Sequence, residues 1–264
     1  MIPAAVEYVR ATSIEDALDA LGREDVKVLA GGQSLLPAMK LRIARPALLV
    51  DIGGLDLDSM DERDGTLVIG ALTTWSSLEA TALRPALAAL TECAAGIGDL
   101  QIRNRGTIGG SLAHADPASD MPAVVLALGA AIRLRSADGE RTVDAADFFV
   151  GPFTTAIRER ELILDIAVPL PPTGSGSAYV AVEHPASGFA LAGAAALVLP
   201  DGSRRVALTG VSGAPFLLDG DVGEAEIFGD RFAPEEYRRE LARTVVHRAV
   251  ELAEARAKED STWT

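Results

Sequence analysis

The feature that most constrains this chain is the segment QIRNRGTIGGSLAHADPASD at residues 101–120. It places three glycines, a threonine, two serines and two aspartates between apolar runs. A second glycine pair occurs earlier, in LAGGQSLL at residues 29–36, which ends the β-branched run VKVLA. Glycine permits positive φ angles and close approach of a ligand to the backbone. Because consecutive amides in such a turn can form an anion-binding nest, each segment is either a tight turn or a phosphate site.

Neither segment matches the dinucleotide fingerprint G-x-G-x-x-G or the P-loop, which disfavours a Rossmann NAD site and a Walker ATPase. Uncharged hydrogen-bonding side chains follow the glycine pairs at Gln33, Ser34 and Ser111, and they suit ribityl or phosphate oxygens. Arg103 and Arg105 flank the second segment and either offset a diphosphate or pair with acidic groups. The residues taken alone favour two plain turns, the second of them preceding a helix.

Asp116 and Asp120 lie four residues apart, a spacing that is open to an acid–base pair. We favour a structural interpretation, in which Ser119 or Asp120 caps the helix MPAVVLALG and Pro122 occupies its first turn. Asp120 could also contact a ligand at that helix end. His114 is expected to be a solvated residue of the loop.

Composition narrows the class of protein. The 264 residues are 48% hydrophobic and 23% charged, as in globular proteins, and the net charge of −14 argues against nucleic-acid binding. No apolar run approaches the ~20 residues of a membrane span, and no secretory signal is evident, so we expect a cytoplasmic protein. The single cysteine, Cys93, excludes an internal disulfide or a cysteine-ligated iron–sulfur cluster in this chain. Cys93 and Trp75 are expected to pack in the core, and Trp263 to lie at a frayed terminus.

The order of expected elements predicts two lobes, a linker and a smaller domain. A helix capped by Ser13, the strand VKVLA, and strands at 46–55 and 65–72 indicate an α/β lobe that ends at about residue 58. Helical segments around Pro85 and strands within 131–170 indicate a second lobe at about 59–170. The segment PPTGSGS at 171–177 is the predicted linker. Residues 178–264 are expected to form a hairpin that turns at 201–203 and a long amphipathic helix from Pro234.

Four stretches carry a family resemblance: VEYVRATSIEDAL, LAGGQSLLPAMKLR, IRNRGTIGGSLAHADPASDMPAVVLALGA and FFVGPFTTAIRERELILDIAVP. The chain resembles, over nearly its whole length, the FAD-binding medium subunit of molybdenum hydroxylases such as carbon monoxide dehydrogenase and xanthine dehydrogenase. The resemblance implies an α+β fold, with a two-lobed vanillyl-alcohol-oxidase-type (PCMH-like) FAD-binding domain at 1–170 and a small α+β domain at 178–264. It also implies partners: an iron–sulfur subunit and a molybdopterin subunit, whose electrons pass through FAD to NAD, a quinone or oxygen.

The resemblance further implies which residues bind FAD. Ile97 would line the flavin pocket, Asp120 would bind a polar part of FAD, and Ile163 would contribute a backbone contact. The two glycine segments would hold the diphosphate and ribityl groups with Leu29, Ala30, Gly31, Gly32, Gln33, Ser34, Leu35 and Leu36, and with Thr107, Ile108, Gly109, Gly110 and Ser111.

The sequence departs from the family pattern at residues 111 and 179–189. Ser111 replaces the usual asparagine, a mild change. Where the family carries a lysine, an arginine pair and Gly-Asp-Tyr near the flavin, this chain has Val180, His184-Pro185 and Gly188-Phe189. Most of the cationic side of the pocket is therefore missing, which should alter the flavin potential, although Phe189 could stack on the ring.

This departure leaves other functions open beside the electron-transfer subunit. The chain could be a free-standing FAD-dependent oxidase or dehydrogenase that acts directly on a small molecule. In that case His184 is the first candidate base and His114 the second, since an unperturbed imidazole titrates near neutrality. A weaker alternative is a scaffold chain that binds flavin poorly.

Overall fold

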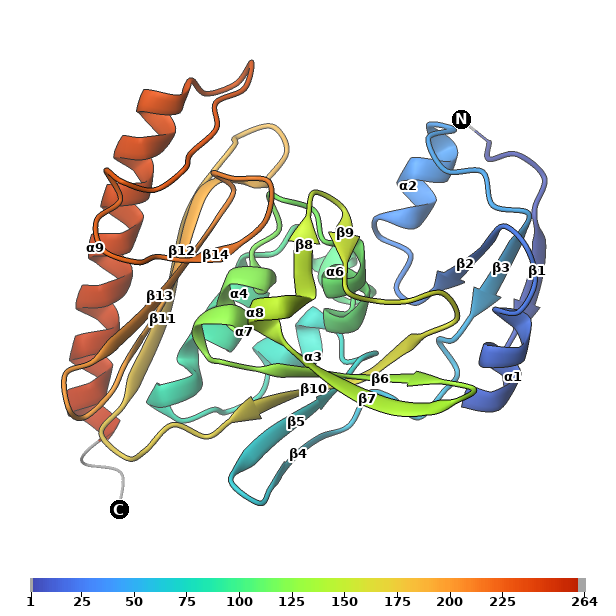
Figure 1. Cartoon of the computed structure of the whole chain (residues 1–264), viewed down its shortest axis with the longest axis horizontal. Coiled ribbons are helices and arrows are strands. Elements are labelled where there is room, and N and C mark those ends of the chain that lie inside the picture. Colours follow the sequence, from blue (N-terminus) through green and yellow to red (C-terminus); the bar gives the residue numbers. More distant parts are fainter. Residues whose placement is uncertain (1, 261–264) are drawn as a thin grey trace.

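The computed structural model describes residues 2–260, so Trp263 lies outside the described part of the chain. Three sheets follow one another across the molecule, with the N-terminal sheet at one end and the long C-terminal helix at the other (Figure 1). Mixed strands and helices confirm the expected α+β class. Within residues 2–260, no helix combines the length and apolar character that crossing a membrane requires.

The first sheet is parallel, in the order β1-β3-β2, and comprises β1 (Glu7–Arg10), β3 (Leu48–Asp51) and β2 (Val26–Leu29). Helix α1 (Ile14–Ala20) connects β1 to β2, and α2 (Leu35–Lys40) lies between β2 and β3. The predicted cap of α1 is confirmed, since Ser13 Oγ accepts a hydrogen bond from Asp16 N at 3.0 Å. A crossover after each strand is what a parallel pair requires, so the helix and strands predicted up to residue 55 are confirmed. The strand predicted at 65–72 as part of this lobe belongs instead to the middle sheet.

The middle sheet has the order β4-β5-β10-β6-β7 and is antiparallel. Its strands are β4 (Met60–Arg63), β5 (Thr66–Gly70), β6 (Ala131–Ser136), β7 (Gly139–Asp144) and β10 (Leu162–Pro169), and β8 (Phe149–Gly151) pairs with β9 (Thr154–Thr155) beside it. Its helices are α3 (Trp75–Glu79), η1 (Pro85–Leu87), α4 (Ala88–Gly96), α5 (Leu100–Arg103), α6 (Ile108–His114), α7 (Met121–Ala127) and α8 (Ala145–Phe148). Every residue of α7 is buried, and Cys93 and Trp75 lie in the same core as expected.

The C-terminal sheet is antiparallel, in the order β11-β12-β13-β14, with β11 (Gly176–Glu183), β12 (Ala190–Val198), β13 (Arg204–Thr209) and β14 (Phe216–Leu217). The predicted hairpin turn is confirmed, because Ser203 N donates to Asp201 Oδ1 at 2.9 Å between β12 and β13. Helix α9 (Glu235–Asp260) lies along this sheet (Figure 1). Its buried alanines and Val245 pack on the alanine-rich β12.

The predicted linker at 171–177 is wrong at its C-terminal end, because β11 already begins at Gly176. Ser175 and Ser177 are fully buried, and Ser177 Oγ accepts a hydrogen bond from Ala89 N at 3.0 Å. A Cβ atom on Gly176 would overlap the backbone of α9 at Ala253. Glycine and serine are selected here for close packing, although their composition is that of a flexible linker. We propose to keep the other boundaries, near residues 58 and 170.

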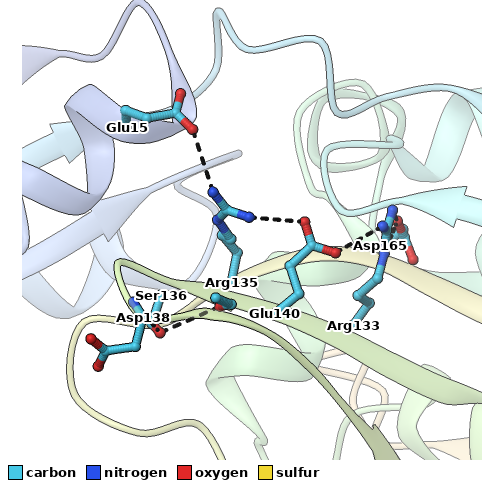
Figure 2. Close-up of polar contacts among 8 residues, drawn as sticks. Glu15, Arg133, Arg135, Ser136, Asp138, Glu140 and Asp165 are labelled. Atoms are coloured by element: carbon cyan, nitrogen blue, oxygen red, sulfur yellow. Dashed lines mark hydrogen bonds and ion pairs between the residues drawn. The ribbon is translucent and has the colours of Figure 1, made fainter.

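Charged side chains join the N-terminal lobe to the middle sheet (Figure 2). Arg135 on β6 lies 3.8 Å from Glu15 of α1 and 3.3 Å from Glu140 on β7. Glu140 also pairs with Arg133 at 3.1 Å, and Arg133 donates through Nε to Asp165 on β10 at 2.9 Å. The chain of alternating charges therefore runs from the buried middle of the sheet to the first lobe.

A second polar connection fastens the C-terminal sheet to the middle lobe. Arg256 of α9 donates to Glu92 of α4 at 2.8 Å and to the carbonyl of Ser177 at 2.8 Å. Glu92 also accepts from the backbone N of Tyr179 on β11 at 3.0 Å. The hydrogen bond to Glu92 raises the pKa of Arg256, so this guanidinium stays charged throughout the ordinary pH range.

Candidate functional site

The first glycine segment leaves the carboxyl end of β2 and leads into α2. Ligands of open α/β sheets bind outside the carboxyl ends of parallel strands, and this segment has that position. Gly32 has a φ angle of +75°, which a side chain would strain, and Ser34 at the helix start makes no side-chain capping bond. The local sequence therefore provides an irregular turn with exposed polar side chains at Gln33 and Ser34.

The backbone of this turn is rich in unused donors. Within residues 2–260, the amides of the five residues 31–35 have no hydrogen-bond acceptor. Carbonyl oxygens of the same turn are in use, since Gly32 O accepts from Leu36 N at 3.0 Å and Ser34 O from Ala38 N at 3.2 Å. Amides that have no acceptor in the protein are available to donate hydrogen bonds to a bound anion, and these bonds stabilise the anion. This segment can accept a phosphate group with its backbone alone.

The second glycine segment is built differently, and the expectation that it is a turn preceding a helix is wrong. Helix α6 already begins at Ile108, so Gly109 and Gly110 lie in its first turn. Thr107 Oγ1 caps the helix by accepting from Gly110 N at 3.2 Å. Gly109 N donates to Ala71 O at 2.9 Å, and Ser111 N donates to Thr107 O at 3.0 Å. This segment therefore offers no nest of free amides.

The two segments nevertheless meet in space, as the figure also indicates for α6 and the turn before α2 (Figure 1). A Cβ atom on Gly31 would overlap the carbonyl oxygen of Arg105 and lie 3.0 Å from Gly106 Cα. A Cβ atom on Gly110 would lie 3.8 Å from Ala30 Cβ. The glycines thus allow the N-terminal lobe to touch the backbone that leads into α6, and they bring Leu29–Leu36 and Thr107–Ser111 into one site.

Asp120 lies beside this site but does not cap its helix, which corrects the sequence prediction. Neither Asp120 nor Ser119 makes the capping bond, since Asp120 Oδ1 accepts from the hydroxyl of Tyr179 and Ser119 Oγ pairs with Ser111 Oγ at 2.9 Å. Burial raises the pKa of Asp120 to about 6, and the nearby Glu183 adds to that rise. Burial also raises the pKa of Tyr179 well above its ordinary value.

The other residues expected to bind FAD occupy separate places around the middle lobe. Ile97 ends α4 and is half-buried, and the position of a Cβ atom on the preceding Gly96 lies 3.9 Å from Glu183 Oε1. Ile163 is buried in β10, opposite Leu134 of β6. Phe189 is 48% exposed at the tip of the β11–β12 hairpin. The end of α4 and the end of β11 therefore approach each other, but within residues 2–260 no hydrogen bond joins Ile163 or Phe189 to the glycine segments.

The two candidate bases, His184 and His114, each pack against a phenylalanine ring. His184 Nδ1 lies 3.3 Å from the donor Ala186 N, and its ring packs against Phe232 with centroids 4.8 Å apart. His114 is exposed at the end of α6, with its ring centroid 5.2 Å from that of Phe153. No contact within residues 2–260 joins the two histidines. Cys93 is fully buried, which raises the pKa of its thiol well above the ordinary value and makes it a poor nucleophile.

Sequence reasoning missed Tyr179 and Glu183, which face Asp120 from β11. A Cβ atom on Gly193 of β12 would overlap the Tyr179 hydroxyl, so this glycine makes room for the hydrogen bond to Asp120. The sequence held a signal for it: a glycine inside the alanine-rich strand ALAGAAALV marks a close approach. Tyr179 and Asp120 themselves are 59 residues apart in the chain and carry no local signal.

Comparison with known proteins identifies relatives of this arrangement. Residues 4–171 match the family model described as FAD binding domain in molybdopterin dehydrogenase. The carbon monoxide dehydrogenase medium chain of Afipia carboxidovorans is 39% identical, over 98% of this chain and 100% of the relative. The 6-hydroxypseudooxynicotine dehydrogenase complex subunit alpha of Paenarthrobacter nicotinovorans is 43% identical, over 76% of this chain and 69% of the relative. A crystal structure of cyanide-inactivated Cu,Mo-CO dehydrogenase superposes with a TM-score of 0.91 at 37% identity, covering 97% of this chain and 100% of that chain.

Proposed function

This chain belongs to the family of FAD-binding domains of molybdopterin dehydrogenases, and from that membership we propose that residues 29–36 and 107–111 hold its FAD. The chain is an FAD-binding flavoprotein subunit of an oxidoreductase of the molybdenum hydroxylase type. Its relatives are named as medium chains and complex subunits, so they work in heteromeric assemblies. We further propose that an iron–sulfur chain delivers the electrons, that a molybdopterin chain oxidises the substrate, and that the assembly is cytoplasmic.

The chemistry of the donor set fits FAD. One observation carries the placement: five consecutive amides at residues 31–35 lack an acceptor within residues 2–260, and they begin at Gly31, where the two segments touch. These amides would bind the diphosphate without a cationic side chain, which suits a chain of net charge −14. Exposed Gln33 and Ser34 would add side-chain hydrogen bonds to the sugar or phosphate oxygens.

The second segment would contribute in another way. Since its amides are already bonded and Gly109 is buried against Ala71, Gly110 would provide a smooth backbone surface, and Ser111 would offer its hydroxyl. We place Asp120, Ile97, Ile163 and Phe189 around the remainder of the cofactor. When bound, FAD supplies a redox centre that can exchange electrons one or two at a time, which iron–sulfur partners require. The side chains of this subunit orient the group and exclude water; they do not transform the organic substrate.

The names of the relatives favour this division of work. Two chains that are each about two-fifths identical to this one are named for carbon monoxide and for 6-hydroxypseudooxynicotine, substrates with no chemistry in common. The substrate is therefore recognised elsewhere in such an assembly. The same proposal includes an electron acceptor, which is NAD, a quinone or oxygen, and it does not choose between these three. His184 and His114 remain the candidate bases of a free-standing enzyme, but the contacts of their rings, with Phe232 and Phe153, do not favour that alternative.

A charged substitution tests the placement of the diphosphate. We expect Ser34→Asp to lower FAD affinity at least tenfold, because the new carboxylate would stand beside the phosphates. Ser34 is exposed and makes no capping bond, so the melting temperature of the FAD-free chain should not change. Ser59→Asp, at another exposed serine, is the matched control and should bind FAD like the parent. Equal FAD affinity of the Ser34→Asp chain and its control would show that the phosphate lies elsewhere.

A backbone substitution tests the junction. Gly31→Ala should reduce the FAD retained on purification to less than a tenth, since its methyl group would overlap Arg105 O and separate the segments. Gly151→Ala is a control with the same type of substitution, because a Cβ atom on Gly151 would meet nothing within 4 Å and neither Gly151 nor Gly31 has a positive φ angle. Parental FAD content in the Gly31→Ala chain would contradict the proposed contact.

A further inference from the structure

The turn that follows α2 exposes large apolar side chains. Leu41 is 58% exposed and Ile43 is 79% exposed, whereas Met39 and Pro46 on either side of them are buried. We call residues Lys40 to Arg45 the 40–45 turn. Two large aliphatic side chains exposed on one turn mark an interaction site more often than a single one does.

The 40–45 turn is held rigidly in this form. Four successive amides of the turn donate to carbonyl oxygens of α2: Leu41 N to Pro37 O at 3.0 Å, Arg42 N to Met39 O at 3.0 Å, and Ile43 N and Ala44 N to Ala38 O at 2.9 and 3.3 Å. Arg42 has a φ angle of +60°, a conformation that costs free energy for a residue with a side chain. Such strain persists where the surroundings enforce it, and it is frequent at binding surfaces. A pre-formed turn loses little entropy when a partner binds it.

Charge is segregated in the same place. Residues 26–50 contain four basic residues and no acidic one, in a chain that has 38 acidic residues in total. Lys40, Arg42 and Arg45 are exposed and form no ion pair with any residue between 2 and 260, whereas Arg103, Arg133 and Arg256 are paired. An apolar centre with unpaired basic side chains around it complements a protein surface with an apolar recess and an acidic rim.

The position of the turn relates it to the cofactor site. Helix α2 starts at Leu35, the last of the five residues 31–35 whose amides have no acceptor. The helix also packs on the glycine turn, since a Cβ atom on Gly32 would lie 3.0 Å from the side chain of Leu36. One six-residue helix thus separates the proposed diphosphate segment from the 40–45 turn. Figure 1 shows α2 on the N-terminal lobe, at the opposite end of the molecule from α9.

We propose that the 40–45 turn is the docking surface for the iron–sulfur partner chain, whose matching surface has an acidic rim around an apolar recess. This inference rests on the proposed function, because it needs such a partner. Leu41 and Ile43 are the apolar anchors. Lys40, Arg42 and Arg45 set the orientation and the rate of association.

Association of the full chain with the purified iron–sulfur chain tests the proposal. Leu41→Asp/Ile43→Asp should weaken binding at least tenfold, while FAD content and melting temperature stay parental. Leu217→Asp, at a 41% exposed leucine on β14, is the control and should bind like the parent. Lys40→Glu should weaken binding about threefold and reduce its dependence on salt, because it removes a rim charge. Lys27→Glu, at an exposed lysine of β2, controls for charge and should do neither.

Three results would overturn the proposal. The first is parental affinity of both the double variant and Lys40→Glu. The second is loss of self-association of the isolated chain with unchanged partner binding, which would assign the turn to a second copy of this chain. The third is binding of the parent, but not the double variant, to vesicles with anionic lipid, again with unchanged partner binding. If the parent chain itself does not bind the iron–sulfur chain, the proposed function fails as well, so the two failures can be told apart.

Discussion

Asp120 is the residue whose surroundings differ most from what its position suggests. It stands at the N-terminal end of α7, yet its carboxylate accepts a hydrogen bond from Tyr179 of the C-terminal sheet. Burial, with Glu183 and Asp116 nearby, raises its pKa to about 6 from an ordinary value of 3.8. The hydroxyl of Tyr179 opposes that rise by stabilising the ionised form. In the FAD-free chain, the fold therefore disfavours the ionised form of the Asp120 carboxyl group.

The stability of the FAD-free chain should depend on this residue in a definite direction. Because the pKa of Asp120 is higher in the folded chain than in the unfolded one, the folded chain binds more protons between about pH 4 and 6. Its contribution to stability is present below about pH 4 and is lost as the pH rises through 6. Asp120→Asn has no such loss, and its amide oxygen can still accept from Tyr179. We expect this variant to be more stable than the parent at pH 7.5, by on the order of 2 kcal/mol.

Thermal unfolding at a series of pH values measures this difference. The gap between variant and parent should be small near pH 4 and should grow up to about pH 7. Asp138→Asn, at an exposed aspartate in the β6–β7 turn, should show no comparable growth. A gap that narrows as the pH rises would mean that Asp120 is stabilised in its ionised form.

At the scale of elements, the two glycine pairs show how one motif serves two structures. In the first pair the backbone stays irregular and its amides stay free, whereas the second pair lies inside α6. Helix propensity argues against two glycines in a helix, each costing about 1 kcal/mol relative to alanine. Packing prevails because a Cβ atom on Gly109 would lie 2.6 Å from Ala71 Cβ, closer than any side chain fits. Helix α6 can approach the end of β5 only with glycine there.

Capping of α6 can be tested by a conservative pair of variants. Thr107 is 7% exposed, and its Oγ1 is the acceptor for Gly110 N. Thr107→Val removes that acceptor and should cost about 1 kcal/mol of unfolding free energy, whereas Thr107→Ser should restore most of it. Urea unfolding measures both.

The cap of α1 provides the control, because Ser13 Oγ has the same role at a helix outside the proposed site. Ser13→Ala should cost a similar free energy and leave FAD affinity unchanged, while Thr107→Val should lower both quantities. If Thr107→Val lost stability but kept parental FAD affinity, α6 would not belong to the cofactor site.

Local signals in the sequence predicted many of these elements. Ser13, the turn at 201–203 and the helix after Pro234 each depend on neighbouring residues, and each prediction is confirmed. The failures have another origin. The serines at 175 and 177 and the glycine pair at 109–110 owe their conformation to segments distant in the chain, such as Ala71, Ala89 and Ala253. Composition alone cannot reveal a partner 88 residues away.

At the scale of the whole molecule, polar side chains link the three larger sheets to one another. Arg135 and Glu15 join the first lobe to the middle sheet (Figure 2), and Arg256 with Glu92 joins the middle lobe to α9. The Tyr179–Asp120 bond adds a link from the C-terminal sheet to the proposed cofactor site. Family resemblance predicted the fold and the cofactor, but it could not predict these links, because each has at least one side chain outside the quoted motifs. Across this link the carboxylate of Glu183 helps to raise the pKa of Asp120.

We propose that this chain relays electrons through FAD and does not itself oxidise a small molecule. A mixing experiment tests this relay: the FAD-loaded chain is mixed with an iron–sulfur partner chain that has been chemically reduced and freed of excess reductant. We expect the visible absorbance of the oxidised flavin to fall on mixing, and a partner chain left oxidised to cause no change. Unchanged flavin absorbance with the reduced partner would rule out the relay. So would turnover of a small molecule by the isolated chain, with neither iron nor molybdenum present.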